Sequence, residues 1–509
     1  MKAAFPRLSS IAQGPPCIAV VLFVWSVFAP TQWALADRPS AAELNSKIEE
    51  YMVARVGRDH FSGAILLARN GQIVFCHGYG MANLEHDIPC TANTKFRLGS
   101  LTKQFTAMAI LILQERGKIS VNDKIKKYLP DAPKAWDDIT IHHLLSHTSG
   151  IPNYTGFPDF LKTLRIQIAL DDLIAKFKDK PLDFKPGEKF KYSNSGYIVL
   201  GKIIEVASGR NYAAFVKEAI FDPLEMHDTG YDNPALILKQ RASGYTRILG
   251  LAPANAVYID MSIPHAAGAL YSTVLDLLKW DRALDSEKLV ARKSIEAMFT
   301  PFKDNYGYGW TIDAKLDQPR YAHLGGIPGF VTVIQRFPAE KLLVVALSNV
   351  DSARVDRIGN DLAAIALGGP YVIPREPQAK NIDLALLDSY AGKYEYDRPD
   401  ARDKKMVVTI KKDGKTLMVE GAGPARVVAI PESETRFYLK GADVTLEFAK
   451  DTTGIVTHVT LLEDNRIIKA LRVETAAQAD KAGKTTPKPN SPTAKQAAPQ
   501  PAAVPGSPP

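Results

Sequence analysis

The chain has 509 residues, which is too long for one small domain and predicts at least two folded units. Its hydrophobic fraction of 46% is that of a globular protein. The formal net charge of +8 is spread along the chain rather than gathered into one long basic run, so the composition argues against nucleic-acid binding.

The first 36 residues have the pattern of a secretory signal peptide. Lys2 and Arg7 precede an apolar run over 17–29, and Ala34-Leu35-Ala36 form a small-x-small cleavage site. The apolar run is short for a membrane span. We therefore expect residues 1–36 to be cleaved and the protein to be periplasmic or secreted, without an integral membrane span afterwards. An uncleaved anchor is the alternative.

Periodicity of apolar residues predicts a first helix over 41–53, and then strands over 63–68 and 72–77. Asn70-Gly71 between these strands is a strong hairpin signal. Further on, the pattern predicts helices over 141–145, 169–176, 198–207, 271–284 and 355–367, and strands over 308–310, 323–337 and 341–349, with a hairpin at 338–340.

The segment from Phe96 to Thr106 carries the first candidate site. Apolar residues 107–113 follow it and predict a buried helix that ends near Gly117. Ser100 and Lys103 stand three residues apart at the start of that helix, so they share one face. A serine becomes a nucleophile when a neighbour takes its proton, and a lysine can do so where burial favours its neutral form.

Two further polar segments follow downstream. Tyr192-Ser193-Asn194 precedes the helix expected over 198–207, which ends at Gly209. His323-Leu324-Gly325-Gly326 leads into strand-like residues. Each segment alone is also consistent with an ordinary loop.

The composition changes at 369–382, where prolines and glycines mark a linker. Beyond it, short β-rich runs predict eight strands within 383–474, over 390–396, 406–411, 416–420, 425–430, 435–439, 444–449, 456–462 and 467–473. This spacing predicts a small antiparallel barrel or sandwich. Residues 475–509 are rich in alanine, proline and lysine without apolar periodicity, which predicts a disordered tail.

Cysteines and histidines outside these motifs are candidates for disulfide and metal chemistry. Cys76 and Cys90 could pair in an oxidising compartment, and the sequence leaves open whether they do. His143 and His147 are four residues apart but lack the glutamate of a zinc motif, so no metal is predicted. We interpret His142 and His143 as capping or packing residues.

In the order Ser-x-x-Lys, Tyr-x-Asn, His-x-Gly, the three motifs resemble the serine beta-lactamase and penicillin-binding-protein superfamily. The resemblance is to class C beta-lactamase-like serine hydrolases, a branch that includes D-alanyl-D-alanine carboxypeptidases, D-aminopeptidases and esterases. Short sequence segments at 144–152, 222–226 and 268–273 also resemble this branch. The resemblance implies an α+β fold over 37–368. In this fold an antiparallel sheet is flanked by helices, and a helical lobe is inserted at about 120–260. The β-rich runs resemble a lipocalin-like barrel appended to such hydrolases, for which we expect packing or oligomerisation rather than substrate capture.

The resemblance also implies a role for each motif residue. Ser100 would be the nucleophile, Lys103 its proton acceptor and Tyr192 the second acid/base. Asn194 would hold the acyl amide. The backbone N–H groups of Ser100 and Gly326 would form the oxyanion hole, whose donors stabilise the negative charge that grows on the carbonyl oxygen.

His323 and Gly325 complete the expected substrate-binding set. His323 stands where many relatives have a lysine, and a histidine near neutrality is only partly charged. Gly325 would let the strand approach the substrate, because it has no side chain.

The resemblance implies an exported serine hydrolase that works through a covalent acyl-enzyme, with no metal and no cofactor. The expected substrates are D-amino-acid-containing peptides or amides, with peptidoglycan stem peptides as one source. A short-chain carboxylesterase and a beta-lactamase are the alternatives, and the histidine in place of lysine argues against the latter. The competing hypothesis, from a different functional class, is a non-catalytic protein that binds the cell wall. A homo-oligomer is possible, and the sequence does not determine the oligomeric state.

Overall fold

The computed structural model describes residues 39–247, 253–374, 378–397, 405–420, 426–439, 444–463 and 466–473. The expected signal peptide (1–36) and tail (475–509) lie outside the described residues. Within the described ranges, no helix has the length and apolar character needed to cross a membrane.

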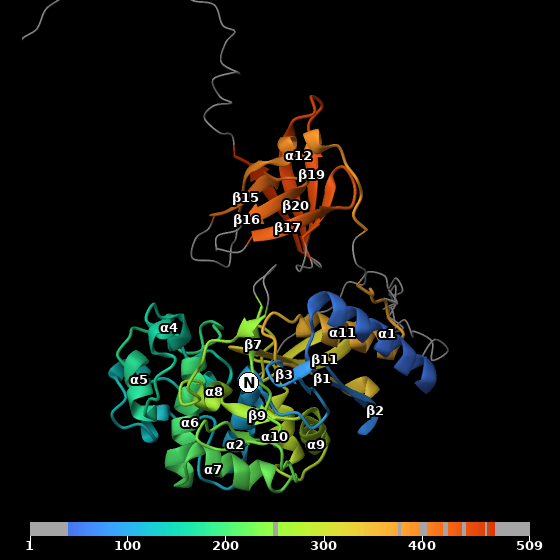
Figure 1. Cartoon of the computed structure of the whole chain (residues 1–509). Helices are drawn as coiled ribbons and strands as arrows, with labels where there is room; N and C mark the ends of the chain where they lie inside the picture. Colours follow the sequence, from blue (N-terminus) through green and yellow to red (C-terminus); the bar gives the residue numbers. More distant parts are fainter. Residues whose placement is uncertain are drawn as a thin grey trace, which may run out of the picture.

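An antiparallel sheet of six strands forms the centre of the larger, N-terminal part, in the order β10-β11-β12-β13-β1-β2 (Figure 1). The strands are β1 (Gly63–Arg69), β2 (Gln72–Tyr79), β10 (Thr311–Lys315), β11 (Gln318–Ile327), β12 (Phe330–Phe337) and β13 (Leu342–Ser348). Gly63 on β1 lies opposite Ser348 on β13. Strands from both ends of this part therefore meet in the middle of the sheet.

Both faces of the sheet are buried, in two separate cores. Leu66 on β1 and Val345 on β13 belong to the core on one face, whereas Ile65 and Val344 belong to the core on the other. Successive side chains of a strand point to opposite faces, so an uninterrupted apolar strand needs cover on both sides. The helices α1 (Ala41–Asp59) and α11 (Val355–Leu367) cover one face, and α2 (Thr102–Glu115), α9 (Val274–Leu284) and α10 (Arg292–Met298) contribute to the core on the other.

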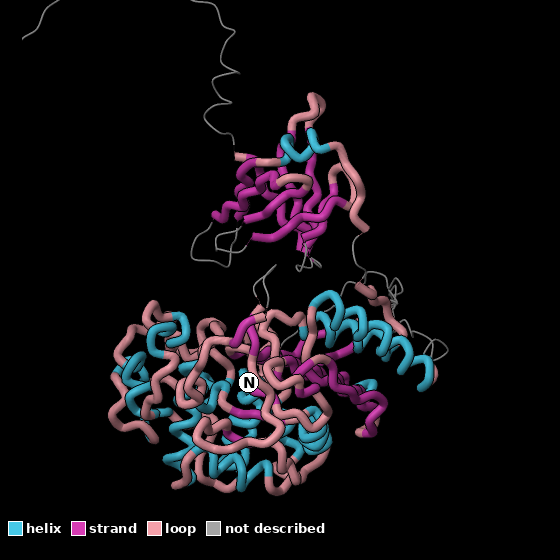
Figure 2. Tube along the Cα trace, viewed as in Figure 1, coloured by secondary structure: helices cyan, strands magenta, loops and turns pink. Residues whose placement is uncertain are grey.

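A mostly helical lobe is inserted between β2 and β10. The tube view shows helices and loops gathered to one side of the strands in this part of the chain (Figure 2). Its helices are α3 (Ile141–Leu145), α4 (Phe160–Thr163), α5 (Leu170–Lys178), α6 (Asn194–Ser208), α7 (Tyr212–Val216) and α8 (His265–Gly268). Short strands accompany it: β3 (Met81–Asn83), β4 (Ile88–Pro89), β5 (Phe96–Arg97), β6 (Gly230–Tyr231), β7 (Tyr245–Thr246), β8 (Ala254–Asn255) and β9 (Leu270–Ser272). The expected α+β fold with an inserted helical lobe is confirmed.

Three expected elements differ from the structure. The single strand expected over 323–337 is two antiparallel strands, β11 and β12, because the chain reverses at Gly329, which has a φ of +82°, and Ile327 pairs with Phe330. The expected helix over 271–284 begins as strand β9, because Phe96 and Arg97 pair with Ser272 and Tyr271, and α9 starts only after the Thr273 cap. The expected strand over 308–310 is a turn instead. Gly309 has a φ of +79°, and a Cβ there would lie 2.9 Å from the Lys103 carbonyl oxygen, so the segment packs as a turn against α2.

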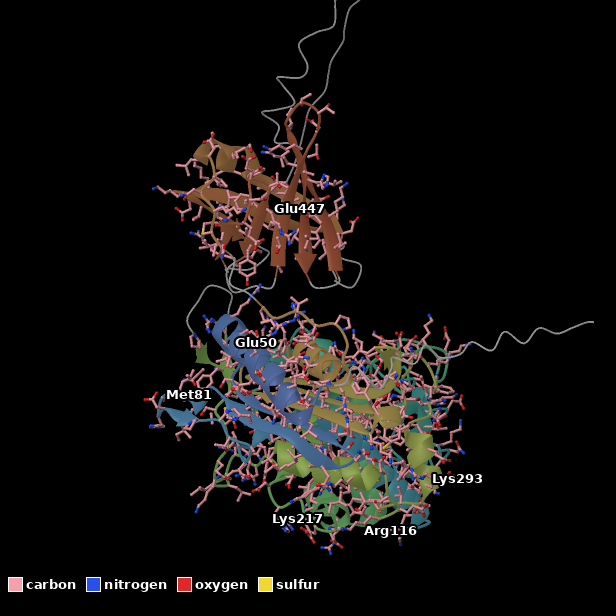
Figure 3. All side chains as sticks on the ribbon, turned by 90° about the vertical axis from the view of Figure 1, so that its right-hand side faces the viewer. Glu50, Met81, Arg116, Lys217, Lys293 and Glu447 are labelled. Atoms are coloured by element: carbon pink, nitrogen blue, oxygen red, sulfur yellow. The ribbon has the colours of Figure 1, made fainter. Side chains whose placement is uncertain are left out.

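The second part of the chain is a closed antiparallel barrel preceded by α12 (Leu384–Tyr390). Its eight strands are β14 (Gly392–Asp397), β15 (Lys405–Asp413), β16 (Thr416–Glu420), β17 (Arg426–Pro431), β18 (Arg436–Leu439), β19 (Val444–Lys450), β20 (Val456–Glu463) and β21 (Arg466–Arg472). Burial alternates along them: Leu446 and Phe448 are buried, and Glu447 between them is exposed (Figure 3). The barrel alternative to a sandwich is confirmed.

The structure shows the state of the cysteines and the histidines whose roles the sequence left open. Cys76 and Cys90 are free thiols. Nδ1 of His143 accepts a hydrogen bond from the backbone N–H of Thr140 at 3.2 Å and closes a capping box at the start of α3. His142 packs its ring against Phe302. The capping and packing interpretation of these histidines is confirmed.

Candidate active site

Ser100 and Lys103 lie at the junction between a short 3₁₀ turn, Gly99–Leu101, and α2. Ser100 is half-buried, whereas the Lys103 side chain is fully buried, with 0% of its surface exposed. The sequence puts them one helical turn apart, and the apolar helix behind them places the amine inside the domain. Nζ of Lys103 lies 3.0 Å from Oγ of Ser100.

Lys103 has two further hydrogen-bond partners, Oδ1 of Asn194 at 2.8 Å and the carbonyl oxygen of Ala267 at 2.9 Å. Burial lowers the pKa of Lys103 well below its ordinary value. A neutral amine has two N–H donors, which match these two oxygens. Its lone pair is then left for the Ser100 hydroxyl, which is the geometry of a base that takes the serine proton.

Tyr192 completes the group. Burial raises the pKa of its phenol above the ordinary value, and the neighbouring Ser100 hydroxyl opposes part of that rise. Nζ of Lys103 lies 4.8 Å from the centre of the Tyr192 ring. The structure therefore brings Ser100, Lys103 and Tyr192 together, with a neutral phenol available as a proton donor.

Residues 147–153, whose role was not predicted from the sequence, hold the loop that carries Tyr192. The backbone oxygen of His147 accepts the N–H of Lys191 at 2.9 Å, and its ring Nδ1 accepts the N–H of Ser193 at 3.2 Å. The two bonds flank Tyr192, and the His147 ring lies 4.2 Å from the Tyr192 ring, centre to centre.

The same segment also fixes the start of α6. Oγ of Ser193 donates to the carbonyl of Ile151 at 2.9 Å, and Oδ1 of Asn153 accepts the N–H of Asn194 at 3.1 Å. The similarity of residues 144–152 to the family was the only sequence signal for this arrangement. That similarity does not reveal which hydrogen bonds the segment makes.

Asn194 lies at the N-terminus of α6 and lines the cleft beside Ser100. Its Oδ1 accepts from Lys103, and its Nδ2 donates to Oγ1 of Thr155 at 3.3 Å. Both ends of the amide are thus engaged by protein groups. Besides the substrate contact expected from the sequence, Asn194 therefore helps to orient the lysine.

The two adjacent glycines of β11 differ in what surrounds them. A Cβ at Gly325 would lie 2.1 Å from the Leu98 carbonyl oxygen and 2.2 Å from Oγ1 of Thr332. Gly325 is therefore required by the close approach of β11 to the segment before Ser100, a reason different from the expected approach to substrate. Gly326 has no atom within 4 Å of such a Cβ and lines the cleft.

The expected oxyanion-hole residues come together through Gly99. Gly99 has a φ of +54°, and a Cβ there would lie 2.8 Å from the backbone nitrogen of Gly326. Only glycine fits this approach at such a φ. Gly326 therefore packs against the residue directly before Ser100, and both Ser100 and Gly326 line the cleft.

His323 is buried behind the site, with 6% of its surface exposed. Its Nδ1 donates to the Leu324 carbonyl at 2.6 Å, and its Nε2 accepts from the Tyr306 hydroxyl at 2.9 Å. Burial, followed by the nearby Lys103, lowers the pKa of His323 to about 3. The expectation of a partly charged histidine is therefore replaced by a neutral one whose two nitrogens are both occupied.

A cleft of about 240 Å³ opens beside Ser100. Glycine and apolar side chains form most of its wall, and Tyr154, Thr155 and Asn194 are the polar contributors besides Ser100. Among the described residues that line it, none has a charged side chain.

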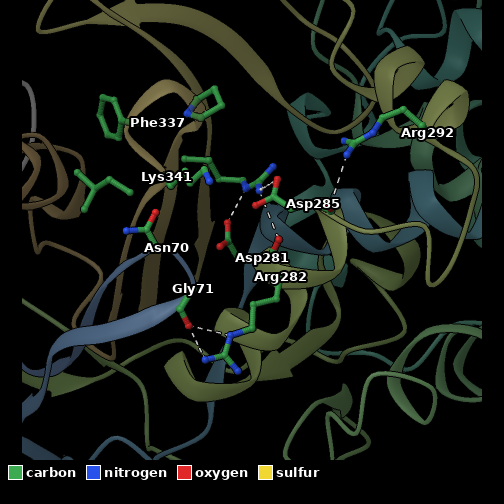
Figure 4. A pocket seen from close by; sticks show the side chains of 11 residues that line it. Asn70, Gly71, Asp281, Arg282, Asp285, Arg292, Phe337 and Lys341 are labelled. Atoms are coloured by element: carbon green, nitrogen blue, oxygen red, sulfur yellow. Dashed lines mark hydrogen bonds and ion pairs between the residues drawn. The ribbon is translucent and has the colours of Figure 1, made fainter.

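A larger cleft of about 500 Å³ lies elsewhere, between the β1–β2 turn, α9 and the β12–β13 turn (Figure 4). Three of its charged side chains are paired with one another: Arg336 bonds Asp281 at 2.5 Å and Asp285 at 2.7 Å. Arg282 donates to the Gly71 carbonyl at 2.8 Å. No serine is among the described residues that line this cleft, so the smaller cleft at Ser100 is the candidate active site.

Comparison with known proteins gives a family match over the larger part of the chain. A family model described as "Beta-lactamase" matches residues 44–368. Penicillin-binding protein 4* of Bacillus subtilis is 33% identical over 448 residues, which cover 82% of this chain and 97% of that protein. The teichoic acid D-alanine hydrolase of Staphylococcus aureus is 29% identical over 325 residues, covering 62% of this chain and 77% of that protein.

Solved structures give the same picture. An octameric penicillin-binding protein homologue from Pyrococcus abyssi superposes with a TM-score of 0.59 at 27% identity, over 83% of this chain and 99% of that one. A D-stereospecific amidohydrolase from Streptomyces sp. superposes with a TM-score of 0.55 at 25% identity. The match covers 65% of this chain and 100% of the amidohydrolase.

Proposed function

The chain belongs to the Beta-lactamase family and is a hydrolase, and we propose that it cleaves D-amino-acid-containing amides, peptides or esters through an acyl-enzyme on Ser100. The observation that carries this proposal is the place of the Lys103 amine. It is fully buried, its pKa is lowered, and it lies 3.0 Å from Oγ of Ser100. These are the conditions under which a lysine activates a serine at neutral pH.

In the first half of the reaction, Lys103 accepts the hydroxyl proton as Oγ of Ser100 attacks the substrate carbonyl. The backbone N–H groups of Ser100 and Gly326 receive the developing oxyanion. The tetrahedral intermediate collapses when the bond to the leaving group breaks and Tyr192 donates a proton to that group. The proton on Lys103 then restores the Tyr192 phenol, and the acyl group remains on Ser100.

In the second half, water takes the place of the leaving group. The phenol and amine pair accepts a proton from the water as its oxygen attacks the acyl-enzyme carbonyl. Collapse of the second intermediate returns a proton to Oγ of Ser100 and releases the acid. Each half uses the same three side chains in reverse proton roles, as microscopic reversibility requires.

Three relatives support a D-amino-acid substrate. Their names record a penicillin-binding protein, a hydrolase of D-alanine on teichoic acid and a D-stereospecific amidohydrolase. The place of His323 favours amides and esters over peptides with a free C-terminal carboxylate. A neutral histidine with both nitrogens occupied offers no charge to that carboxylate.

Export supports the same substrate class, because cell-wall D-alanine is available outside the cytoplasm. It is proposed from the pattern of residues 1–36, and the relatives with wall-directed names agree with it. An N-terminal sequence of the secreted or periplasmic protein beginning near Asp37 would support it. Retention of the intact N-terminus in a membrane fraction would favour the anchored alternative.

The acyl-enzyme is tested by mass spectrometry after incubation with a fluorophosphonate or a slow substrate. We expect an adduct on the peptide that contains Ser100, and none in Ser100→Ala. Activity of D-alanine amide, D-alanyl-D-alanine, nitrocefin and a short p-nitrophenyl ester is then compared as kcat/KM, which measures discrimination. An adduct on another residue, or full turnover by Ser100→Ala, would contradict the proposal.

A further inference from the structure

The cleft beside Ser100 lies on the acyl side of the proposed reaction. Ser100, Asn194 and Gly326 line it. Ser100 and Gly326 would hold the carbonyl that is attacked, and Asn194 would hold the amide of the acyl group. Tyr192, which would protonate the leaving group, does not line it. The part of a substrate that enters this cleft is therefore the acyl group, together with its side chain.

The walls of the cleft are apolar. Two segments of the helical lobe form one side: α4 with the residues after it, and residues 259–264 before α8. They are joined by a bond from the N–H of Asp260 to the Leu164 carbonyl at 2.9 Å. The large aliphatic and phenylalanine side chains that line the cleft are Phe160, Leu161, Leu164, Ile259, Ile263 and Ile327.

The described residues around the reacting group offer no fixed charge to an anionic substrate. Lys162 and Arg165 are neighbours of Leu161 and Leu164 in the sequence, but neither lines the cleft. Lys103 is buried, does not line the cleft, and is bonded to protein oxygens. A carboxylate that entered the cleft would lose water without gaining a partner, which is strongly unfavourable.

We propose that this cleft selects an uncharged, apolar acyl group, so that the substrates are D-amino-acyl amides or esters with an aliphatic or aromatic side chain. The inference rests on the proposed function, since it assigns the acyl group of the same reaction. Leu161 determines the selectivity at the mouth of the cleft, because it lines the cleft while 76% of its surface is exposed.

The test uses p-nitrophenyl esters of N-acetylated D-leucine, D-glutamine and D-glutamate. Glutamine and glutamate have the same shape, so their comparison isolates charge, and leucine against glutamine isolates polarity. We expect kcat/KM to fall in the order leucine, glutamine, glutamate, with at least about a hundredfold between the first and the last, because a buried unpaired carboxylate is costly.

A matched pair of variants then adds charge to the site. Leu161→Lys places an ammonium at the mouth of the cleft and should raise the glutamate-to-glutamine ratio of kcat/KM about tenfold. Ile166→Lys is the control. Its side chain is 62% exposed on the same segment but does not line the cleft, so the ratio should stay at the wild-type value.

The outcomes separate the two proposals. If no ester leaves an adduct on Ser100, the proposed function fails. If Ser100 is acylated but the glutamate ester reacts as fast as the leucine ester, the function stands and the selectivity is wrong. An equal change of the ratio in Leu161→Lys and Ile166→Lys would also overturn the selectivity, because it would reflect the general field of the protein.

Discussion

Nδ1 of His147 accepts a hydrogen bond from the backbone N–H of Ser193 at 3.2 Å, directly after the tyrosine of the proposed active site. Burial lowers the pKa of His147 well below its ordinary value, so the ring is neutral and its Nδ1 is free to accept. His147 itself has a φ of +56°, which turns its backbone oxygen to Lys191 at 2.9 Å. One residue therefore fixes the chain on both sides of Tyr192.

His147→Leu should lower kcat about ten- to hundredfold with little change in KM, because a phenol displaced by a fraction of an ångström transfers its proton poorly. The buried N–H of Ser193 loses its acceptor, so unfolding should also become easier, by about 1–3 kcal/mol. Steady-state kinetics and thermal melting measure the two effects separately.

His143→Gln is the matched control for that variant. His143 lies on α3, which ends two residues before His147, and glutamine keeps the capping box at Thr140. It should retain wild-type kcat. His147→Asn, which tolerates a positive φ and keeps an acceptor, should recover part of the lost rate. A folded His147→Leu enzyme with normal kcat would show that Tyr192 needs no such support.

Lys103→Ala and Tyr192→Phe should each lower kcat/KM by orders of magnitude, and the double variant should lose less than the sum of the two in activation free energy. Both groups act on the Ser100 proton, and residues that work as one relay are strongly non-additive. The measurement is a double-mutant cycle of kcat/KM. Clean additivity would mean that the two side chains serve separate steps.

Gly325→Ala should destabilise the fold by about 1–3 kcal/mol, the usual range for overpacking. Its Cβ would overlap the Leu98 carbonyl at 2.1 Å and Oγ1 of Thr332 at 2.2 Å. Gly326→Ala is the neighbouring control, because open space surrounds its Cβ. It should melt near the wild-type temperature. Equal melting of the two variants would contradict the close approach of β11 to the serine turn.

The parts of the site that the sequence predicted are local. Ser100 and Lys103 share a face because they are three residues apart on a helix, and that relation needs no knowledge of the rest of the fold. The apolar strands of the sheet were predictable for the same reason. Residues 63–68 and 341–349 are apolar enough to be read as buried strands without their partners.

The parts that the sequence missed depend on contacts between distant segments. The bonds of His147 to the Tyr192 loop and the burial of His323 behind Tyr306 are tertiary relations. The start of the expected helix at 271 is a strand because it pairs with residues beside Ser100. In each case a residue that is distant in the sequence determines the local structure or burial. Local periodicity contains no information about that residue.

The lowered pKa of Lys103 leads to the last prediction, a pH dependence of stability. The folded protein holds the amine neutral through burial, whereas an unfolded chain protonates it below its ordinary pKa of about 10.4. Between the folded and unfolded pKa values, the unfolded state therefore binds one more proton. Stability must then rise with pH over that window, by up to about 1.4 kcal/mol per pH unit, and the contribution must level off above it.

Lys103→Met isolates this contribution, because it removes the titrating group and leaves the other ionisable side chains in place. We expect the free energy of unfolding of the wild type, relative to Lys103→Met, to increase from pH 7 to pH 9.5. Denaturant unfolding of both proteins at the two pH values measures it. The same lysine should make kcat/KM fall as the pH drops through its folded pKa. A wild-type stability that tracks the variant at both pH values would mean that the buried amine stays protonated, and the role of Lys103 as the base at Ser100 would have to be abandoned.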